Sequence, residues 1–335
     1  MPRSFVILAA LFALGAAACS QDTDNDALVV YSAGPRPLAE AVIEAYVEET
    51  GQRVEFFGAT TGQVMARLEA ERYRPRADVV IFASEVAAEA LKDQGRLQPY
   101  PDPGWLEDTE GEWHDPDHYY FATAAALVGM AVREEAFREE LDWEALFQGY
   151  FPGRMTMPSP SRSGSAADFV IAYSLAHPDT MWEDFLGLRR AGLDFAAANS
   201  QAISGLLVGT YDLIVGAVDY LIYRQIADGA PLVMHYPPSG SALVRRPIAI
   251  LDSSQHVAAA RAFVDHYFSA AMQEEVAGQH LLPARRGISP SATRGEHALP
   301  ALLPSDPVAA LAEQNRVLRR FQIEVERAEV IADPN

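Results

Sequence analysis

Four short turns in this sequence combine small residues with hydroxyl groups, and each is followed at once by a pattern that predicts a helix. They lie at residues 32–34, 60–62, 83–84 and 163–165. The first N–H groups of a helix have no partner within the helix, and the helix dipole places positive charge there, so such turns can bind anions. The candidate ligand-binding residues in these turns are Ser32, Gly34, Thr60, Thr61, Gly62, Ser84, Ser163, Gly164 and Ser165.

The hydroxyl groups have a simpler use. A serine or threonine before a helix is most often the N-cap of that helix, and for any one turn taken alone we favour this use. Four such turns facing one site favour a polar or anionic ligand, and one residue can serve both purposes.

The turns belong to a regular order of strands and helices. Apolar runs at residues 27–31, 53–57 and 78–82 predict buried strands, and apolar residues at helical spacing follow each of them. This alternation predicts a parallel sheet with crossover helices, which is the α/β class. Ligands of such sheets bind beyond the carboxyl ends of the strands, where the turns lie.

A second α/β unit follows. The apolar run at residues 120–133 is long enough to pass from one domain to another. Further strands are expected at 154–157, 193–195 and 213–217, a returning strand at 247–251, and helices at 255–277 and 307–329.

Length and charge limit the possible functions. The chain has 335 residues, which suggests about two domains. It carries 26 basic and 46 acidic side chains, for a formal net charge of -20. This excess of acids argues against nucleic acid as a partner, since phosphate backbones need a basic face. It does not exclude one small anion, because a local site can override the net charge.

The N-terminus reads as an export signal. Arg3 precedes a short apolar run, and residues 1–18 are predicted to be a cleaved signal peptide. The next residue is Cys19, the only cysteine in the sequence. Its position resembles that of the acylated cysteine of bacterial lipoproteins, although Ala16 stands where leucine is usual. Residues 19–26 would then be a lipid-anchored tether, and the alternative is simple cleavage that leaves a free thiol.

Short motifs along the chain match one family in their order and spacing. They are Val-Val-Tyr-Ser at 29–32, Glu-Glu-Thr-Gly at 48–51, Thr-Thr-Gly at 60–62, Ala-Asp-Val-Val at 77–80, Ser-Gly-Ser-Ala at 163–166, Val-Gly-Ala-Val-Asp-Tyr at 215–220, Gly-Ala-Pro-Leu at 229–232 and Tyr-Pro-Pro-Ser-Gly at 236–240. On these motifs the chain resembles the periplasmic solute-binding proteins of bacterial ABC importers, in the branch with ferric-ion, phosphonate and sugar-phosphate binders. The motifs identify the family and not the ligand.

The resemblance implies a two-lobed periplasmic-binding-protein fold of type II, with parallel-rich sheets, a hinge and a ligand cleft between the lobes. Residues 27–122 with about 248–300 are expected to form lobe one, residues 123–247 lobe two, and residues 301–335 a C-terminal helix packed on the lobes. The implied function is capture of a small anion in the periplasm or cell envelope and its delivery to permease subunits with a cytoplasmic ATPase. The resemblance implies no cofactor, and a monomer.

Ferric ion is the alternative ligand that the resemblance raises. Iron binders of this family usually hold the metal with adjacent tyrosines, because phenolate oxygens suit a hard cation. Tyr220 stands at the matching place, but its neighbour is Leu221, and Tyr223 lies one helical turn further on. The family's hinge-strand arginine is missing from residues 121–125, so we favour an organic or phosphorylated anion. Asp219 either binds a ligand amine or caps the helix of Tyr220.

Other residues point less clearly to a function. The sequence has no Gly-x-Ser-x-Gly, His-Glu-x-x-His or phosphate-loop motif. An exported hydrolase therefore stays an alternative that no motif supports. An envelope sensor that binds the same ligand is a further alternative. His114 and His118 flank Asp-Pro-Asp and are expected to be solvated loop residues rather than metal ligands. For Arg245 and Arg246 we favour surface ion pairs over contact with an anion.

Overall fold

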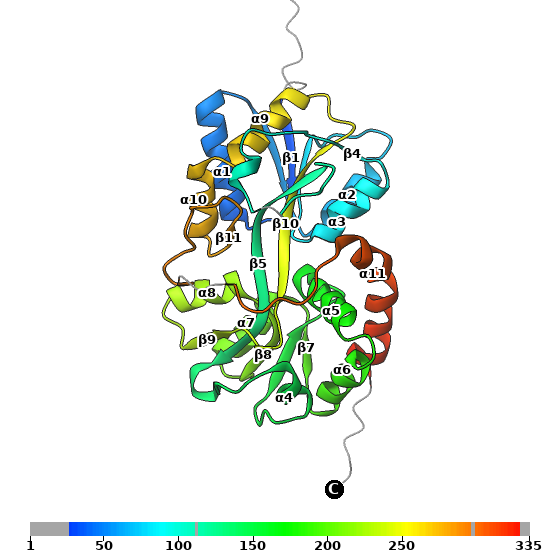
Figure 1. Cartoon of the computed structure of the whole chain (residues 1–335), viewed down its shortest axis with the longest axis vertical. Coiled ribbons are helices and arrows are strands. Elements are labelled where there is room, and N and C mark those ends of the chain that lie inside the picture. Colours follow the sequence, from blue (N-terminus) through cyan, green and yellow to red (C-terminus); the bar gives the residue numbers. More distant parts are fainter. Residues whose placement is uncertain (1–26, 111–112, 296–298, 329–335) are drawn as a thin grey trace, which may run out of the picture.

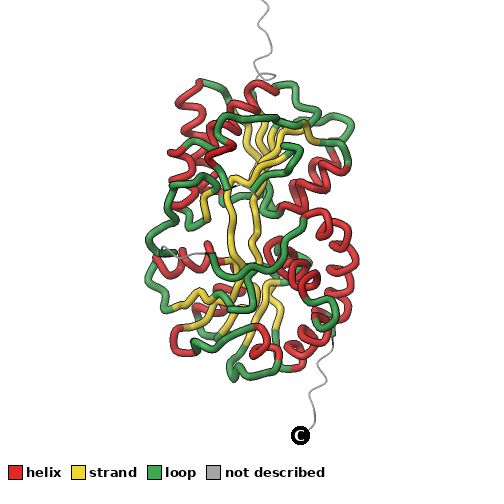
Figure 2. Tube along the Cα trace, viewed as in Figure 1, coloured by secondary structure: helices red, strands yellow, loops and turns green. Residues whose placement is uncertain are grey.

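A computed structural model of the chain describes residues 27–110, 113–295 and 299–328. The predicted signal peptide, the tether and Cys19 lie outside the described residues. Two lobes are stacked along the long axis of the molecule, and in each lobe helices surround a central group of strands (Figures 1 and 2). None of the helices in these three ranges is long and apolar enough to cross a membrane.

Lobe one, the upper lobe in Figure 1, confirms the predicted strand–helix alternation. Its elements are β1 (Leu28–Ser32), α1 (Arg36–Thr50), β2 (Val54–Gly58), α2 (Thr61–Ala70), β3 (Val79–Ile81) and α3 (Glu85–Asp93). Strand β1 pairs in parallel with both β2 and β3. The chain returns to this lobe in two helices, α9 (Val257–Tyr267) and α10 (Ala270–Gly278). The single helix expected here is interrupted because Ser269 adopts an extended conformation and caps α10.

Two long antiparallel strands join the lobes. They are β5 (Tyr120–Arg133) and β10 (Ala242–Leu251), and both run vertically from one lobe into the other in Figure 1. Strand β10 begins five residues before the predicted start at 247, inside lobe two. Its pairing with β5 shifts register between Arg246 and Pro247, where proline cannot donate a ladder hydrogen bond. This strand pair lies where the resemblance implies a hinge, and we call β5 and β10 the hinge strands.

Lobe two is a second α/β unit. Its strands are β6 (Met155–Pro158), β7 (Asp194–Ala196), β8 (Leu213–Val218) and β9 (Leu232–His235), and its helices are α4 (Trp143–Phe147), α5 (Gly164–Ala176), α6 (Met181–Arg190), α7 (Asn199–Leu207) and α8 (Asp219–Ala227). Strand β6 is parallel to both β7 and β8. One sheet passes through the whole molecule in the order β2-β1-β3-β10-β5-β8-β6-β7, with the short strands β4 (Leu97–Gln98) and β11 (Leu282–Pro283) beside it.

The C-terminal helix contacts both lobes. Helix α11 (Pro307–Phe321) packs on α3 of lobe one and on α5 of lobe two, and it continues into a π-helix over Gln322–Glu326. Phe321 is fully buried against Phe185 of α6, with ring centroids 5.0 Å apart. The helix therefore braces one side of the region between the lobes.

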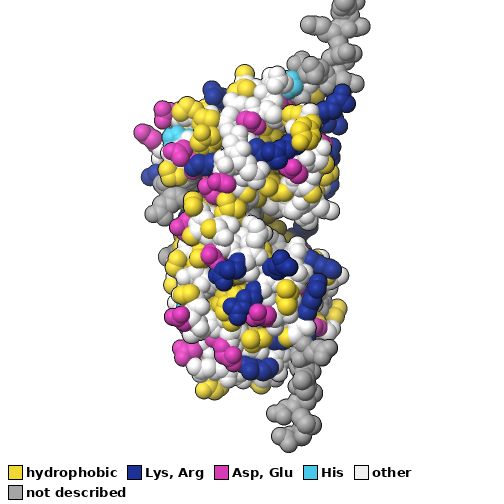
Figure 3. Space-filling model, turned by 90° about the vertical axis from the view of Figure 1, so that its right-hand side faces the viewer, with side chains coloured by type: hydrophobic (Ala, Val, Ile, Leu, Met, Phe, Trp, Pro, Cys, Tyr) yellow, Lys and Arg dark blue, Asp and Glu magenta, His cyan; other side chains and the backbone are white. Residues whose placement is uncertain are grey.

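The surface on the side of α11 shows the same two-part shape. The molecule narrows between the lobes, and basic side chains gather on the lower lobe (Figure 3).

Candidate ligand-binding site

A cleft lies between the lobes beside the hinge strands, with a volume of about 670 Å³. This is within the range of roughly 300–1,000 Å³ that small-molecule sites occupy. Lobe one contributes the turn after β1, the start of α2, and Ala83 in the turn between β3 and α3. Lobe two contributes the turn before α5 and the starts of α7 and α8, and β10 contributes Arg246. The cleft therefore lies at the carboxyl ends of strands from both lobes, as the sequence predicted from the turns.

The structure brings most of the predicted ligand residues to this cleft, but not all. Those that line it are Thr60, Thr61, Gly62, Ser163, Gly164, Ser165 and Tyr220. Ser32, Gly34, Ser84, Asp219 and Tyr223 are not part of its wall. Each of these five has other contacts, which are described below.

At the start of α2, one threonine caps the helix and the next threonine has a hydroxyl group that can donate into the cleft. Thr60 is the N-cap: its hydroxyl accepts from the Gln63 N–H at 3.3 Å, and the Gln63 side chain accepts from the Thr60 N–H at 3.1 Å. Thr61 is the first residue of the helix, and its hydroxyl accepts from the Ala83 N–H at 3.2 Å. An oxygen that accepts in this way keeps its own proton to donate. Thr61 can therefore donate to an anion without loss of the helix cap.

In lobe two, side chains join the starts of two helices. Ser163 caps α5 by accepting from the Ala166 N–H at 3.3 Å. The Ser163 hydroxyl also lies 3.3 Å from Asn199 Oδ1, and the Asn199 amide donates to Ser165 at 3.3 Å. Asn199 is the first residue of α7 and lines the cleft, although the sequence analysis did not identify it. Two helix N-termini therefore face the same space, and both favour negative charge.

Arg246 is the most important residue that the sequence analysis placed wrongly. It lines the cleft, yet its side chain is only 5% exposed. One guanidinium N–H donates to the Ala33 carbonyl at 3.1 Å, and the guanidinium carbon lies 5.6 Å from the centre of the Tyr220 ring. The expected surface pairing is wrong because β10 extends through this segment. Neighbouring residues of a strand point to opposite faces, so Arg246 faces the cleft while Arg245 points away from it.

Ser32 and Gly34 form a closed turn instead of a ligand site. The Ser32 hydroxyl accepts from the Gly34 N–H at 3.0 Å, and Ser32 is 1% exposed. The N-cap of α1 is Pro35, which has no side-chain hydrogen bond. A Cβ on Gly34 would lie 3.1 Å from the Ser32 hydroxyl, so glycine suits the tight packing of this turn. From this turn the cleft receives Ala33 alone.

Asp219 is fully buried in an ion-pair cluster, so it neither faces a ligand amine nor caps α8. Its carboxylate accepts from Arg294 at 2.5 Å and from the Leu127 N–H of β5 at 3.0 Å. The Tyr236 hydroxyl lies 3.0 Å from the same carboxylate and 3.1 Å from the Tyr223 hydroxyl. Burial raises the pKa of Asp219, and the charge of Arg294 opposes that rise.

The position of Tyr223 also affects the iron hypothesis. Tyr223 is 7% exposed and lies in this buried cluster, whereas Tyr220 lines the cleft. Only one of the two tyrosines that the sequence suggested for iron therefore lines the cleft.

The two histidines of the loop before β5 are the other candidate metal ligands. His114 and His118 have ring centroids 5.5 Å apart. Within the described ranges, no group of three or more His, Cys, Asp and Glu side chains could hold a metal ion.

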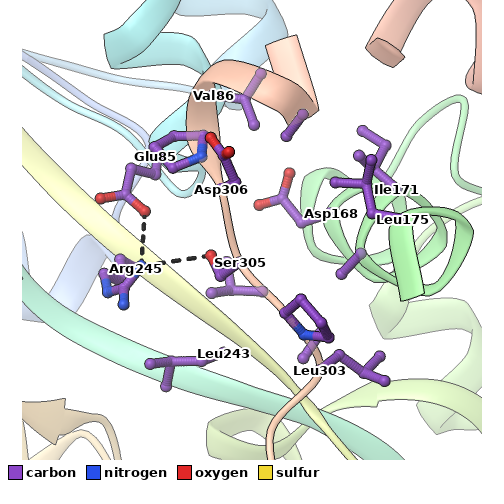
Figure 4. Close-up of a pocket in the computed structure, with 16 residues that line it drawn as sticks. Glu85, Val86, Asp168, Ile171, Leu175, Leu243, Arg245, Leu303, Ser305 and Asp306 are labelled. Carbon is purple, nitrogen blue, oxygen red and sulfur yellow. Dashed lines mark hydrogen bonds and ion pairs between the residues drawn. The ribbon is translucent and has the colours of Figure 1, made fainter. Parts of the chain in front are cut away.

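Ser84 connects the lobes on another side of the hinge strands. Its hydroxyl donates to Asp168 of α5 at 2.8 Å, and the next residue, Glu85, forms an ion pair with Arg245 at 3.1 Å. Asp168, Glu85 and Arg245 line a small cavity of about 40 Å³. Figure 4 shows these residues together with Ser305, which precedes α11. Burial raises the pKa of Asp168 to about 7, while the hydrogen bond from Ser84 opposes the rise.

Comparisons with known proteins agree with this architecture. A family model described as bacterial extracellular solute-binding protein matches residues 27–279. A Sinorhizobium fredii protein, named as a probable ABC transporter periplasmic-binding protein, is 24% identical over 315 residues, which are 90% of this chain and 87% of that protein.

Two solved structures show the same fold. The periplasmic binding protein AfuA from Actinobacillus pleuropneumoniae, with fructose-6-phosphate bound, has a TM-score of 0.80 and 20% identity, covering 90% of this chain and 99% of that chain. Iron-bound HitA from Pseudomonas aeruginosa has a TM-score of 0.76 and 20% identity, covering 88% and 98%. The predicted two-lobed binding-protein fold is confirmed, and the chain belongs to the family of bacterial extracellular solute-binding proteins.

Proposed function

We propose that this chain captures a small anionic solute in its interlobe cleft, in the cell envelope, and delivers it to the membrane permease of an ABC importer. The transport role is supported by the family match and by the name of the Sinorhizobium fredii relative. Family members and structural relatives are binding proteins, and the proposal includes no catalytic step and no cofactor.

The charge of the cleft wall is the observation that carries the choice of an anion. The whole chain has 46 acidic and 26 basic side chains. Among the residues that the structure describes, the charged members of the wall are Arg162 and Arg246, with no aspartate or glutamate. The N-termini of α2, α5 and α7 add positive electrostatic potential at the same place. A cation would be repelled by every one of these groups, so an anion fits the wall.

The structural relatives suggest two ligands to compare, a phosphate-bearing solute and ferric ion. AfuA has been solved with fructose-6-phosphate, and HitA with iron. Ferric ion prefers several anionic oxygen ligands. The wall of this cleft supplies one tyrosine, Tyr220, and no carboxylate among the described residues. We therefore place the phosphate-bearing organic anion first and ferric ion second.

Capture would proceed by closure of the lobes about β5 and β10. Hydroxyl and N–H donors of lobe one lie at the start of α2, and those of lobe two lie at the starts of α5 and α7. A ligand that bonds to both sets has higher affinity for the closed form and shifts the population toward it. The permease would recognise this closed form, with the binding protein acting as a monomer.

Native mass spectrometry of the protein as purified tests the choice of ligand. The expected result is a bound mass that corresponds to a small organic anion, with partial occupancy that disappears in the Arg246→Gln variant. A bound iron atom, together with the visible absorption of a phenolate–iron complex, would replace the proposal with its alternative. A neutral or cationic organic solute would contradict both.

We also propose that the protein stays in the envelope through a lipid on Cys19. The proposal rests on the sequence, in which the cysteine follows an apolar export signal and precedes a short polar segment. One acyl chain binds membranes only marginally, whereas two or more anchor a protein stably.

A further inference from the structure

One turn supplies a large part of the lobe-two wall of the cleft. Ser161, Arg162 and Ser163 all line the cleft, and they lie between the end of β6 and the start of α5. The turn is closed by its own backbone, because the N–H groups of Arg162 and Ser163 both donate to the Ser159 carbonyl, at 3.0 and 2.9 Å. The position of Ser159 therefore determines the position of the three cleft residues.

A carboxylate from the far end of the chain holds this turn. Glu326 Oε1 accepts from the Ser159 hydroxyl at 3.0 Å and from the Ser161 N–H at 3.3 Å, and Glu326 Oε2 accepts from the Ser161 hydroxyl at 3.2 Å. The two serine hydroxyls also lie 2.7 Å from each other. One side chain thus fixes both serines of the turn, 165 and 167 positions away in the sequence.

The local structure around Glu326 is unusual in a way that fits this role. Glu326 is the last residue of the π-helix that follows α11, and π-helical turns are rare and concentrate at functional sites. Val325 beside it is fully buried, which fixes the backbone at this point. In the part of the chain that the structure describes, the hydrogen-bond partners of the Glu326 carboxylate are serine groups of this turn, and no arginine or lysine forms an ion pair with it. Glu326 also lies outside residues 27–279, the segment that the family model matches.

We propose that Glu326 is a positioning residue of the cleft: its carboxylate holds the turn at residues 159–163 in the conformation in which Ser161, Arg162 and Ser163 face the ligand, while Glu326 itself does not touch the ligand. This inference rests on the proposed function only in taking the cleft as the binding site. Its physical basis is preorganisation. A turn that is already fixed does not lose conformational freedom when the solute binds, so more of the interaction free energy appears as affinity.

Amide hydrogen exchange of the ligand-free mature protein tests the positioning directly. The variants are Glu326→Ala and the near-isosteric Glu326→Gln, with Glu324→Ala as a matched control, because Glu324 is an exposed neighbour that pairs with Arg320 at 2.9 Å. The informative amides are those of Arg162 and Ser163, since neither bonds to Glu326. We expect them to exchange about tenfold or more faster in Glu326→Ala, less so in Glu326→Gln, and unchanged in the control.

One exchange pattern overturns the inference. If only the Ser161 amide, which loses its direct partner, exchanges faster while Arg162 and Ser163 stay protected, then Glu326 does not hold the turn. Unchanged protection in β1 serves as the check that Glu326→Ala is folded. If the alanine variant does not fold, the glutamine variant decides by the same two amides.

Affinity for inorganic phosphate, measured by calorimetry, supplies the second readout. Glu326→Ala should weaken it about tenfold, and the double variant with Ser159→Ala should be no weaker than Glu326→Ala alone, because the two residues act through one contact. Additive losses would overturn the inference. If the wild-type protein does not bind phosphate, that result counts against the anion proposal, and the exchange experiment still decides the role of Glu326.

Discussion

Replacing Arg246 by glutamine removes a cation from the cleft wall and keeps a polar side chain of similar length. Arg246 is 5% exposed, so its charge is poorly screened by water. A charge pair at 4 Å is worth about 4 kcal/mol at an effective dielectric constant of ~20, before the cost of desolvation is subtracted. Hydrogen bonds to charged groups contribute a net ~1.5–3 kcal/mol. Arg246→Gln should therefore weaken anion binding roughly 10- to 150-fold.

The assay is isothermal titration calorimetry with the solute that native mass spectrometry identifies, and two further variants isolate the cause. Arg246→Lys keeps the charge but loses the planar fork, so its loss should be smaller than that of the glutamine variant. Arg245→Gln removes the neighbouring charge, which pairs with Glu85 away from the cleft. That variant leaves a poorly solvated carboxylate unpaired, so it should lower the unfolding temperature while affinity stays within about threefold of wild type.

The outcome that refutes this reasoning is specific. If Arg246→Gln retains its fold and binds the solute within about threefold of wild type, the guanidinium does not contact the ligand. The role of Arg246 would then be structural, through its hydrogen bond to the Ala33 carbonyl. Equal losses in the Arg245 and Arg246 variants would point to damage of the hinge strand instead.

Substitutions at three further positions test other parts of the proposals. Thr61→Asp places a carboxylate at the start of α2, where the helix tolerates it because Thr60 is the cap, and it should abolish anion binding, whereas Thr61→Ser should bind nearly normally in the same titration. Tyr220→Phe should weaken binding of an organic anion by about one hydrogen bond, ~0.5–1.5 kcal/mol, and a complete loss with bleaching of a phenolate–iron colour would favour iron. Cys19→Ala should release the protein from the membrane fraction without a change in affinity, and an unmodified Cys19 peptide in mass spectrometry of the wild-type protein would contradict the lipid anchor.

The parallel sheet of lobe one could be predicted from the sequence because its signals are local. The strands at residues 28–32, 54–58 and 79–81 are short apolar runs, each followed within a few residues by a helix. The turns at the starts of α2 and α5, which line the cleft, could be predicted for the same reason. A hydroxyl group beside glycine at a strand–helix junction is visible in a window of about five residues.

The wrong predictions depended on contacts between distant parts of the chain. The sequence alone suggests Asp219 as a ligand or cap residue, because its partner Arg294 lies 75 positions away and has no sequence signal of its own. The cleft role of Arg246 depends on the length of β10, and that length is set by pairing with β5. A single sequence reveals the tendency to form a strand, but the partner strand decides where the strand begins.

The last prediction concerns Asp168, whose hydrogen bond from Ser84 joins the two lobes. Burial raises the pKa of Asp168 from 3.8 to about 7, with Glu85 adding to the rise, and the Ser84 hydrogen bond and the charge of Arg246 opposing it. Between about pH 4 and pH 7 the folded protein therefore keeps a proton on Asp168 that the unfolded chain has released. The stability that this protonated side chain contributes is fully present below the unfolded pKa and is lost as the pH rises through the folded pKa.

Asp168→Asn mimics the neutral side chain at every pH and still accepts from Ser84. It should match wild type near pH 4 in urea unfolding and be more stable near pH 8, by at most about 4 kcal/mol for a pKa change from 3.8 to about 7. Asp179→Asn, at an exposed site in the same lobe, should leave the stability difference between the two pH values as in wild type. If Asp168→Asn is instead less stable than wild type, and by the same amount at pH 4 and at pH 8, the carboxylate is needed in its charged form. The contact with Ser84 would then be a charge-assisted bond that holds the lobes together, and not a buried neutral one.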